Sequence, residues 1–114
     1  MASKYLTEEG ELRVKVQPGI CGLECTIVAR NSDSQTAEII VIESDCKKIQ
    51  KMSSLLNKIN ITQVMIPMDK NPVYLASADA GLHPSCPLPS AVIKACEVVL
   101  DLAVPQDVQI CFEK

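Results

Sequence analysis

The sequence predicts a small α+β domain in two layers, in which helices cover one face of a β-sheet. Three stretches typical of strands come first, two long helical patterns and a short one follow, and a further strand pattern comes last. Because strands and helices are segregated along the chain, we expect a small antiparallel or mixed sheet with the helices packed on one face.

Four stretches account for the expected strands in the first two thirds of the chain. Residues 12–16 alternate strictly between apolar and charged side chains, and residues 26–30 follow a loop with two glycines. Residues 37–43 contain four consecutive Ile and Val residues, which indicate a strand covered on both faces and therefore central in the sheet. Residues 61–66 are ambiguous, and we interpret them as a short edge strand stopped by the next proline.

Three helical segments and a last strand complete the predicted domain. Residues 46–57 place apolar side chains on one face, and Ser44 and Asp45 are the expected cap. Residues 72–80 follow an asparagine, begin with a proline and precede a glycine, which is typical of a short capped helix. A second long helix is expected over residues 88–102, and residues 108–112 alternate as a strand.

Length and composition indicate one globular domain and exclude several classes of function. We interpret residues 1–10 as a flexible leader and residues 11–114 as a single domain. A hydrophobic content of 47% excludes a disordered chain, and a net charge of −3 without a basic cluster argues against nucleic acid. No run reaches the roughly 18 apolar residues that cross a membrane, and the N-terminus lacks the pattern of a signal peptide. We therefore expect a cytoplasmic protein.

Six cysteines and a single histidine are the main functional signal. In a reducing cytoplasm such cysteines pack, bind metal or react rather than form disulfides. Cys46 and Cys86 each stand at the start of a predicted long helix, where free N–H groups and the positive end of the dipole stabilise a thiolate. Cys21 precedes a glycine, and His83 lies three residues before Cys86 in a proline-braced loop.

The remaining cysteines are less informative. In a straight strand the sulfurs of Cys21 and Cys25 would lie about 13 Å apart, whereas a turn at Gly22 would bring them together. Cys96 and Cys111 are expected to be packing residues, in the second long helix and the last strand. For Cys46 and His83 the alternative to a functional role is a structural one: Cys46 as a small buried residue and His83 as a surface histidine.

Two family resemblances rest on short motifs. The stretches Pro-Gly-Ile-Cys-Gly at 18–22, Glu-Ser-Asp-Cys at 43–46, Asn-Pro-Val-Tyr at 71–74 and His-Pro-Ser-Cys-Pro-Leu-Pro-Ser at 83–90 resemble a small family of uncharacterised bacterial and archaeal proteins, a domain of unknown function. That resemblance covers nearly the whole chain and implies no established activity.

The layout of residues 20–102 is also similar to the iron–sulfur scaffold fold of IscU and the N-terminal domain of NifU. In that resemblance the cluster-binding roles fall to Cys21, Cys46 and Cys86, with His83 beside the last of them. The Ser-Cys-Pro sequence around Cys86 is similar to that of the related TSCPD-type domains. The chain departs from the scaffolds at Leu23, where they carry an aspartate, and in the wider spacing between histidine and cysteine. A site that holds a metal without passing it on is compatible with both departures.

Three functions remain open at this point. In the first, Cys21, Cys46 and Cys86 bind zinc or an iron–sulfur cluster, with His83 or Cys25 as the fourth ligand. In the second, the chain is a ligand-binding or protein-interaction domain without metal. In the third, Cys46 or Cys86 is the nucleophile of a thiol or redox module and His83 its base. Whether the protein is an enzyme, and which protein it binds, is not indicated.

The expected partners follow from the same patterns. We expect neither nucleic acid nor a membrane as a partner. The strand predicted at residues 108–112 would present an edge that a second copy could pair with, so a homodimer is compatible with the sequence.

Overall fold

The structure, a computed structural model, describes residues 3–114, so the first two residues of the predicted leader lie outside the described residues. One antiparallel sheet has the strand order β1-β2-β3-β4. Its strands are β1 (Glu11–Val16), β2 (Cys25–Asn31), β3 (Thr36–Ser44) and β4 (Lys58–Asn60). The first three agree closely with the strands that the sequence predicts.

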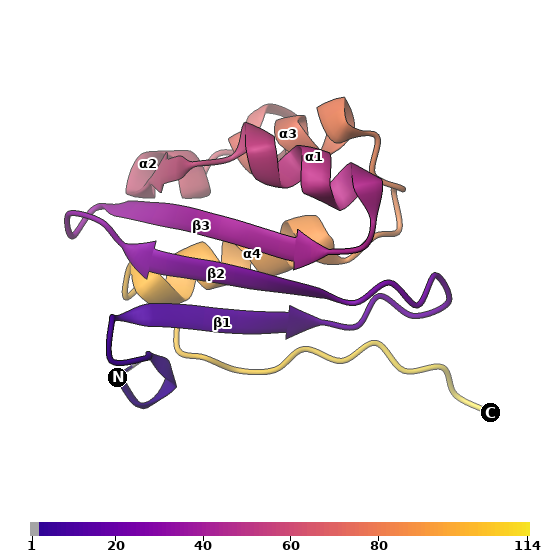
Figure 1. Cartoon of the computed structure of the whole chain (residues 1–114), viewed down its shortest axis with the longest axis horizontal. Helices are drawn as coiled ribbons and strands as arrows, with labels where there is room; N and C mark the ends of the chain where they lie inside the picture. Colours follow the sequence, from indigo (N-terminus) through magenta and orange to yellow (C-terminus); the bar gives the residue numbers. More distant parts are fainter. Residues whose placement is uncertain (1–2) are drawn as a thin grey trace.

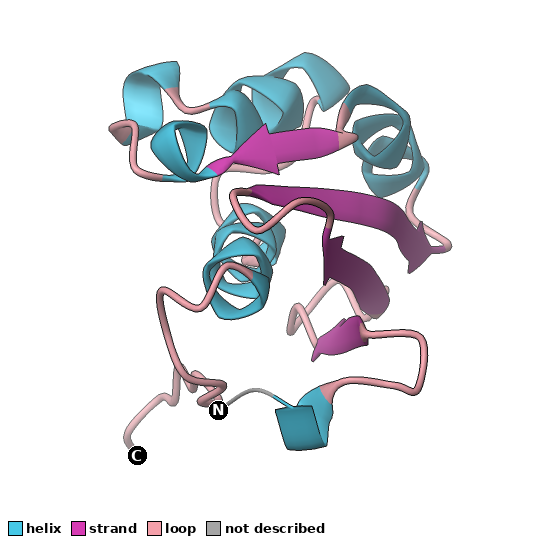
Figure 2. Cartoon of the chain, turned by 90° about the vertical axis from the view of Figure 1, so that its left-hand side faces the viewer, coloured by secondary structure: helices cyan, strands magenta, loops and turns pink. Residues whose placement is uncertain are grey.

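The helices form a second layer on one face of this sheet. They are α1 (Lys47–Leu55), α2 (Ile61–Val64), α3 (Pro72–Ala80) and α4 (Leu88–Val99), with short 3₁₀ turns at Ser3–Tyr5 and Met68–Lys70. Helix α4 packs against β2 and β1, and α1 packs against β3 and α3. Figure 1 shows α4 behind the strands with α1 and α3 above it, and Figure 2 shows the same layers from the side. The predicted two-layer α+β fold is confirmed.

The hydrophobic core lies between the sheet and the helices. Val14, Ile27 and Ile42 are neighbours across β1, β2 and β3, and all three face the helices because alternate residues of a strand share a face. Ile49 and Met52 of α1 are buried against this layer, as the helical periodicity predicts. The core therefore fixes where β2, α1 and α4 begin.

The outer face of the sheet carries charged side chains together with the buried Val28 of β2. Arg13 forms an ion pair with Glu43 at 3.2 Å, and Arg30 forms one with Glu38 at 2.8 Å. Strand β3 does lie inside the sheet, but the prediction that both of its faces are covered is wrong. A register shift opposite the Val28/Ala29 step leaves Ile40 of β3 without a partner and 39% exposed, so a continuous apolar run does not mean two buried faces here.

Residues 61–66 do not form the predicted edge strand. The strand is shorter and earlier, at β4, and the chain turns directly into α2. The Asn60 side chain accepts a hydrogen bond from the Gln63 N–H at 2.9 Å, and the Gln63 side-chain oxygen accepts one from the Asn60 N–H at 2.9 Å. This reciprocal capping starts a helix where the apolar pattern alone favoured a strand.

Helix α3 has the predicted ends. Asn71 is its N-cap, Pro72 follows, and Gly81 ends it with a φ of 77°. The buried Asn71 amide also donates to the carbonyl oxygens of Gln63, Val64 and Ile66, at 3.2, 3.2 and 2.9 Å. One side chain thus joins the chain after α2 to the start of α3.

The end of the chain differs most from prediction. Helix α4 stops at Val99 rather than near Leu102, and Asp101 has a φ of 60°, which a right-handed helix cannot accommodate. The Asn31 amide donates to the Val99 carbonyl oxygen at 2.9 Å and fixes that end of the helix to β2. Beyond it the described chain forms no helix or strand, so the strand predicted at residues 108–112 is absent from the sheet.

None of the helices within residues 3–114 has the length and apolar character needed to cross a membrane.

Candidate functional site

Three cysteine-bearing stretches of chain meet at one end of the sheet. The loop after β1 carries Cys21, and Cys25 is the first residue of β2. Cys25 lies opposite Ser44, the last residue of β3, and Cys46 follows two residues later at the start of α1. Cys86 lies two residues before α4. Figure 1 shows all of these segments at the right-hand end of the sheet, where β2, α1 and α4 begin.

The four thiols differ in burial. Cys25 is 2% exposed and belongs to the hydrophobic core, and the partly buried Cys46 and Cys86 pack against that same core. Cys21 is exposed, in a turn that the Gly22 N–H closes by donating to the Gly19 carbonyl at 3.0 Å. Of the two alternatives for this stretch, a straight strand or a turn at Gly22, the structure therefore has the turn.

The electrostatics of Cys25 connect these cysteines. Burial, and to a lesser extent the negative charges that Cys86, Cys46 and Cys21 would carry as thiolates, together raise the pKa of the Cys25 thiol from 9.0 to about 12. The structure thus brings the segments that carry four of the five predicted site residues to one end of the sheet.

Both helix starts at this end leave their N–H groups without a side-chain cap. Cys46 is the N-cap of α1 and Pro87 that of α4, and neither side chain accepts a hydrogen bond from the first turn. The prediction that Ser44 caps α1 is wrong, because its hydroxyl accepts from the Cys46 N–H, at 3.1 Å, rather than from a helical residue. Free N–H groups next to a sulfur stabilise negative charge on it.

Two lysines strengthen this effect at α1. Lys47 and Lys48 occupy its first turn, where the helix dipole ordinarily favours acidic side chains. Positive charges in that place disfavour an isolated helix start but attract an anion beside it. The first turn of α1 is therefore suited to a neighbour that carries negative charge, such as a thiolate.

His83 lies against the same helix. Its ring Nε2 is 3.5 Å from the Lys48 Nζ, so the lysine donates a long hydrogen bond to the histidine. Its carbonyl oxygen accepts from the Cys86 N–H at 3.0 Å, which makes the His83–Cys86 stretch a tight turn. The exposed histidine is thus placed between Cys86 and the first turn of α1.

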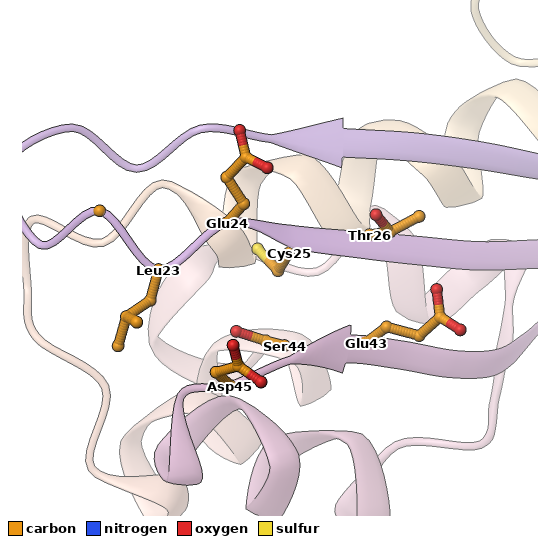
Figure 3. Close-up of a pocket in the computed structure, with 8 residues that line it drawn as sticks. Leu23, Glu24, Cys25, Thr26, Glu43, Ser44 and Asp45 are labelled. Carbon is orange, nitrogen blue, oxygen red and sulfur yellow. The ribbon is translucent and has the colours of Figure 1, made fainter.

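An open pocket lies where β2 begins and β3 ends. It has a volume of about 530 Å³ and is lined by Gly22, Leu23, Glu24, Cys25, Thr26, Glu43, Ser44 and Asp45. In Figure 3 the Cys25 sulfur lies between Glu24 on one side and Ser44 and Asp45 on the other. Sequence reasoning did not assign these carboxylates to the site; the available signal was their position next to Cys25 and Cys46.

The thiols are near one another without forming a closed coordination shell. Over the described range, residues 3–114, no three Cys, His, Asp or Glu side chains lie close enough together to hold a metal ion. The donor set itself, four thiols and a histidine, has the chemistry that zinc and iron–sulfur clusters require. Cys21 is the exposed member, and the two glycines that flank it adopt positive φ values of 94° and 70°.

The last two cysteines lie outside this group. Cys96 is fully buried in α4, where burial raises its pKa to about 12, as expected for a packing residue. Cys111 is exposed on the C-terminal segment, so the expectation that it packs in a terminal strand is wrong. All six cysteines are free thiols.

Comparison with known proteins agrees with the more general of the two resemblances. The chain matches the family model DUF6951 over residues 12–112 and belongs to that family, which is described as a family of unknown function. No IscU, NifU or TSCPD family matches the chain. No curated protein and no solved structure matches it either.

Proposed function

We propose that this protein binds zinc or an iron–sulfur cluster through Cys21, Cys25, Cys46 and Cys86, with His83 as the alternative to Cys25. The observation that carries the proposal is the placement of these cysteines. They come from three separate stretches of chain, around residues 21–25, 46 and 86, and the fold brings all three stretches to one end of the sheet. Soft thiolate donors favour zinc or iron–sulfur chemistry over magnesium or calcium.

The surroundings support a centre with negative charge. A metal ion bound by three or four thiolates carries a net negative charge. The uncapped first turns of α1 and α4, together with Lys47 and Lys48, provide positive potential at that place. The apolar core beneath Cys46 and Cys86 excludes water from one side of the centre.

Binding requires two changes in the metal-free arrangement. Cys25 must lose a proton that its buried position holds firmly, and a bound cation lowers the pKa of a coordinating thiol enough to do this. Cys21 must move inward, and the Gly19–Gly22 turn is the segment that would rearrange. Glu24, Glu43 and Asp45 at the pocket add negative charge that attracts a cation toward it.

A domain without metal remains the second candidate. The burial of Cys25 and the packing of Cys46 and Cys86 against the core are also what small structural residues show. The thiol or redox module has less support, because the ring of His83, its expected base, lies 3.5 Å from the Lys48 Nζ and forms no hydrogen bond to Cys46 or Cys86 within the described chain. We propose the cytoplasm as the compartment, where six free thiols stay reduced.

The experiment is elemental and sulfide analysis, with a visible spectrum, of protein purified without oxygen. About one zinc per chain supports a closed thiolate site, and iron with acid-labile sulfide and brown colour supports a cluster. Zinc, iron and sulfide all at background level in soluble, folded protein would reject the metal proposal and favour the domain without metal.

A further inference from the structure

The C-terminal segment, defined as residues 101–114, exposes an alternating apolar pattern. Val108, Ile110 and Phe112 are 60%, 80% and 95% exposed, and polar residues stand between them. Such alternation is typical of a strand that buries one face. In the single chain these three side chains stay exposed. Figure 2 shows the segment running below α4 and away from the strands.

Strand β1 has an unpaired edge that such a strand could join. It pairs with β2 on one side only, and at its other edge the described chain supplies no more than the Leu6–Leu12 bridge. Arg13 to Val16 therefore present an open strand edge, which is a template for another strand. Val14 at that edge is only partly buried, although its neighbours Leu12 and Val16 are buried.

The two partners fit each other in the faces that they present. A strand at residues 108–112, added with Ile110 beside Val14, would place its three apolar side chains on the core face with Leu12, Val14 and Val16, and its end residue would replace Leu6 opposite Leu12. Asp107 and Glu113 at its ends would lie diagonally from Arg13 and Lys15 in either strand direction, and one of the two would lie directly opposite Glu11. Residues 12–16 of β1 and residues 108–112 fall inside the family match.

We propose that residues 108–112 of one copy add as a fifth strand to the β1 edge of a second copy. The occupant is a second copy because, within its own chain, the segment lies away from β1 with all three apolar residues exposed. Each chain carries one open edge and one free strand, so two copies satisfy both reciprocally. This interface is independent of the proposed metal site.

The first test is the oligomeric state under reducing conditions. The unaltered protein should sediment at twice its mass of 12.4 kDa at micromolar concentration. Ile110→Asp should sediment as a single chain with an unchanged circular dichroism spectrum, because Ile110 is 80% exposed in the single chain. Cys111→Ser, whose side chain would face outward, should remain a dimer. A single-chain mass for the unaltered protein at every concentration, or a dimer in Ile110→Asp, would overturn the proposal.

A crosslinking experiment identifies the pairing. Copies with Arg13→Cys or Lys15→Cys, each also with Cys111→Ser, are mixed with unaltered protein and oxidised, and the linked peptides are identified by mass spectrometry. A disulfide from the introduced thiol to Cys111 of the other copy supports the proposal. A link at position 13 indicates antiparallel pairing, and a link at 15 parallel pairing. The absence of a link to Cys111 at both positions contradicts it.

Discussion

Cys25 is the residue on which the candidate site depends most. It is buried at the start of β2, yet its sulfur faces a pocket that Ser44 and Asp45 also line. Burial first, and then the charges that Cys86, Cys46 and Cys21 would carry, raise the pKa of its thiol. A buried thiol with such neighbours stays protonated in the free protein, and it becomes a ligand only when a cation compensates for the charge.

Because the pKa values of the Cys25 and Cys96 thiols are raised, the free energy of unfolding should fall as the pH rises above 9. The pKa of each thiol is raised from 9.0 to about 12 in the folded protein, mainly because both thiols are buried. The folded chain therefore keeps protons that the unfolded chain releases above pH 9. The stability that each thiol contributes is complete below pH 9 and is lost as the pH rises through 12, with a slope of up to about 1.4 kcal/mol per unit.

Urea unfolding of metal-free protein at several pH values above 8 measures this effect. The free energy of unfolding should fall as the pH rises. In Cys96→Ala the slope of this fall should be smaller by about the contribution of one thiol. Comparing the two slopes removes the contribution of lysines and tyrosines, which titrate in the same range. An identical slope in the variant would contradict the account of Cys96.

At the scale of elements, Asn71 holds together the connection from α2 to α3 that leads toward His83. Its side chain caps α3 through the Val73 N–H at 2.9 Å and donates to three carbonyl oxygens. Asn71→Ala should lower the free energy of unfolding by about 2–4 kcal/mol, since it removes a cap and leaves buried carbonyls without a donor.

The matched control for that variant is Asn60→Ala. Asn60 caps α2 in the same way but at an exposed position, so its loss should cost only about 1 kcal/mol. Urea unfolding of both variants gives the comparison. Equal losses would show that the three carbonyl contacts of Asn71 contribute nothing measurable.

Elements with a local signal could be predicted from the sequence. Strand β1 follows from strict alternation, and α3 follows from asparagine, proline and glycine at its ends. Helix α2 was missed because the apolar residues 61–66 outweighed the capping pair Asn60 and Gln63, although that signal was present in the sequence.

The last strand shows a different limit. Residues 108–112 have the right alternation, but a strand also needs a partner edge, and periodicity says nothing about which edge is free or where it lies. The same holds for the site. The helix starts at Cys46 and Cys86 could be inferred locally, whereas the place of Cys25 depends on long-range pairing between β2 and β3.

At the scale of the whole molecule, the fold separates three surfaces. The outer face of the sheet carries ion pairs between Arg13 and Glu43 and between Arg30 and Glu38. The cysteines gather at the end of the sheet where β2, α1 and α4 begin. The open edge of β1 and the C-terminal segment form the third surface. The proposed metal centre and the proposed dimer can therefore be tested separately.

The central claim, that thiols from three separate stretches bind one metal centre, is tested most directly by metal content per chain in single cysteine variants. Protein purified without oxygen should hold about one zinc or one cluster per chain. Cys25→Ser, Cys46→Ser and Cys86→Ser should each lose most of it, whereas Cys111→Ser, a cysteine outside the group, should keep it all. Metal at background in the unaltered protein, or equal metal in all four variants, would contradict the claim.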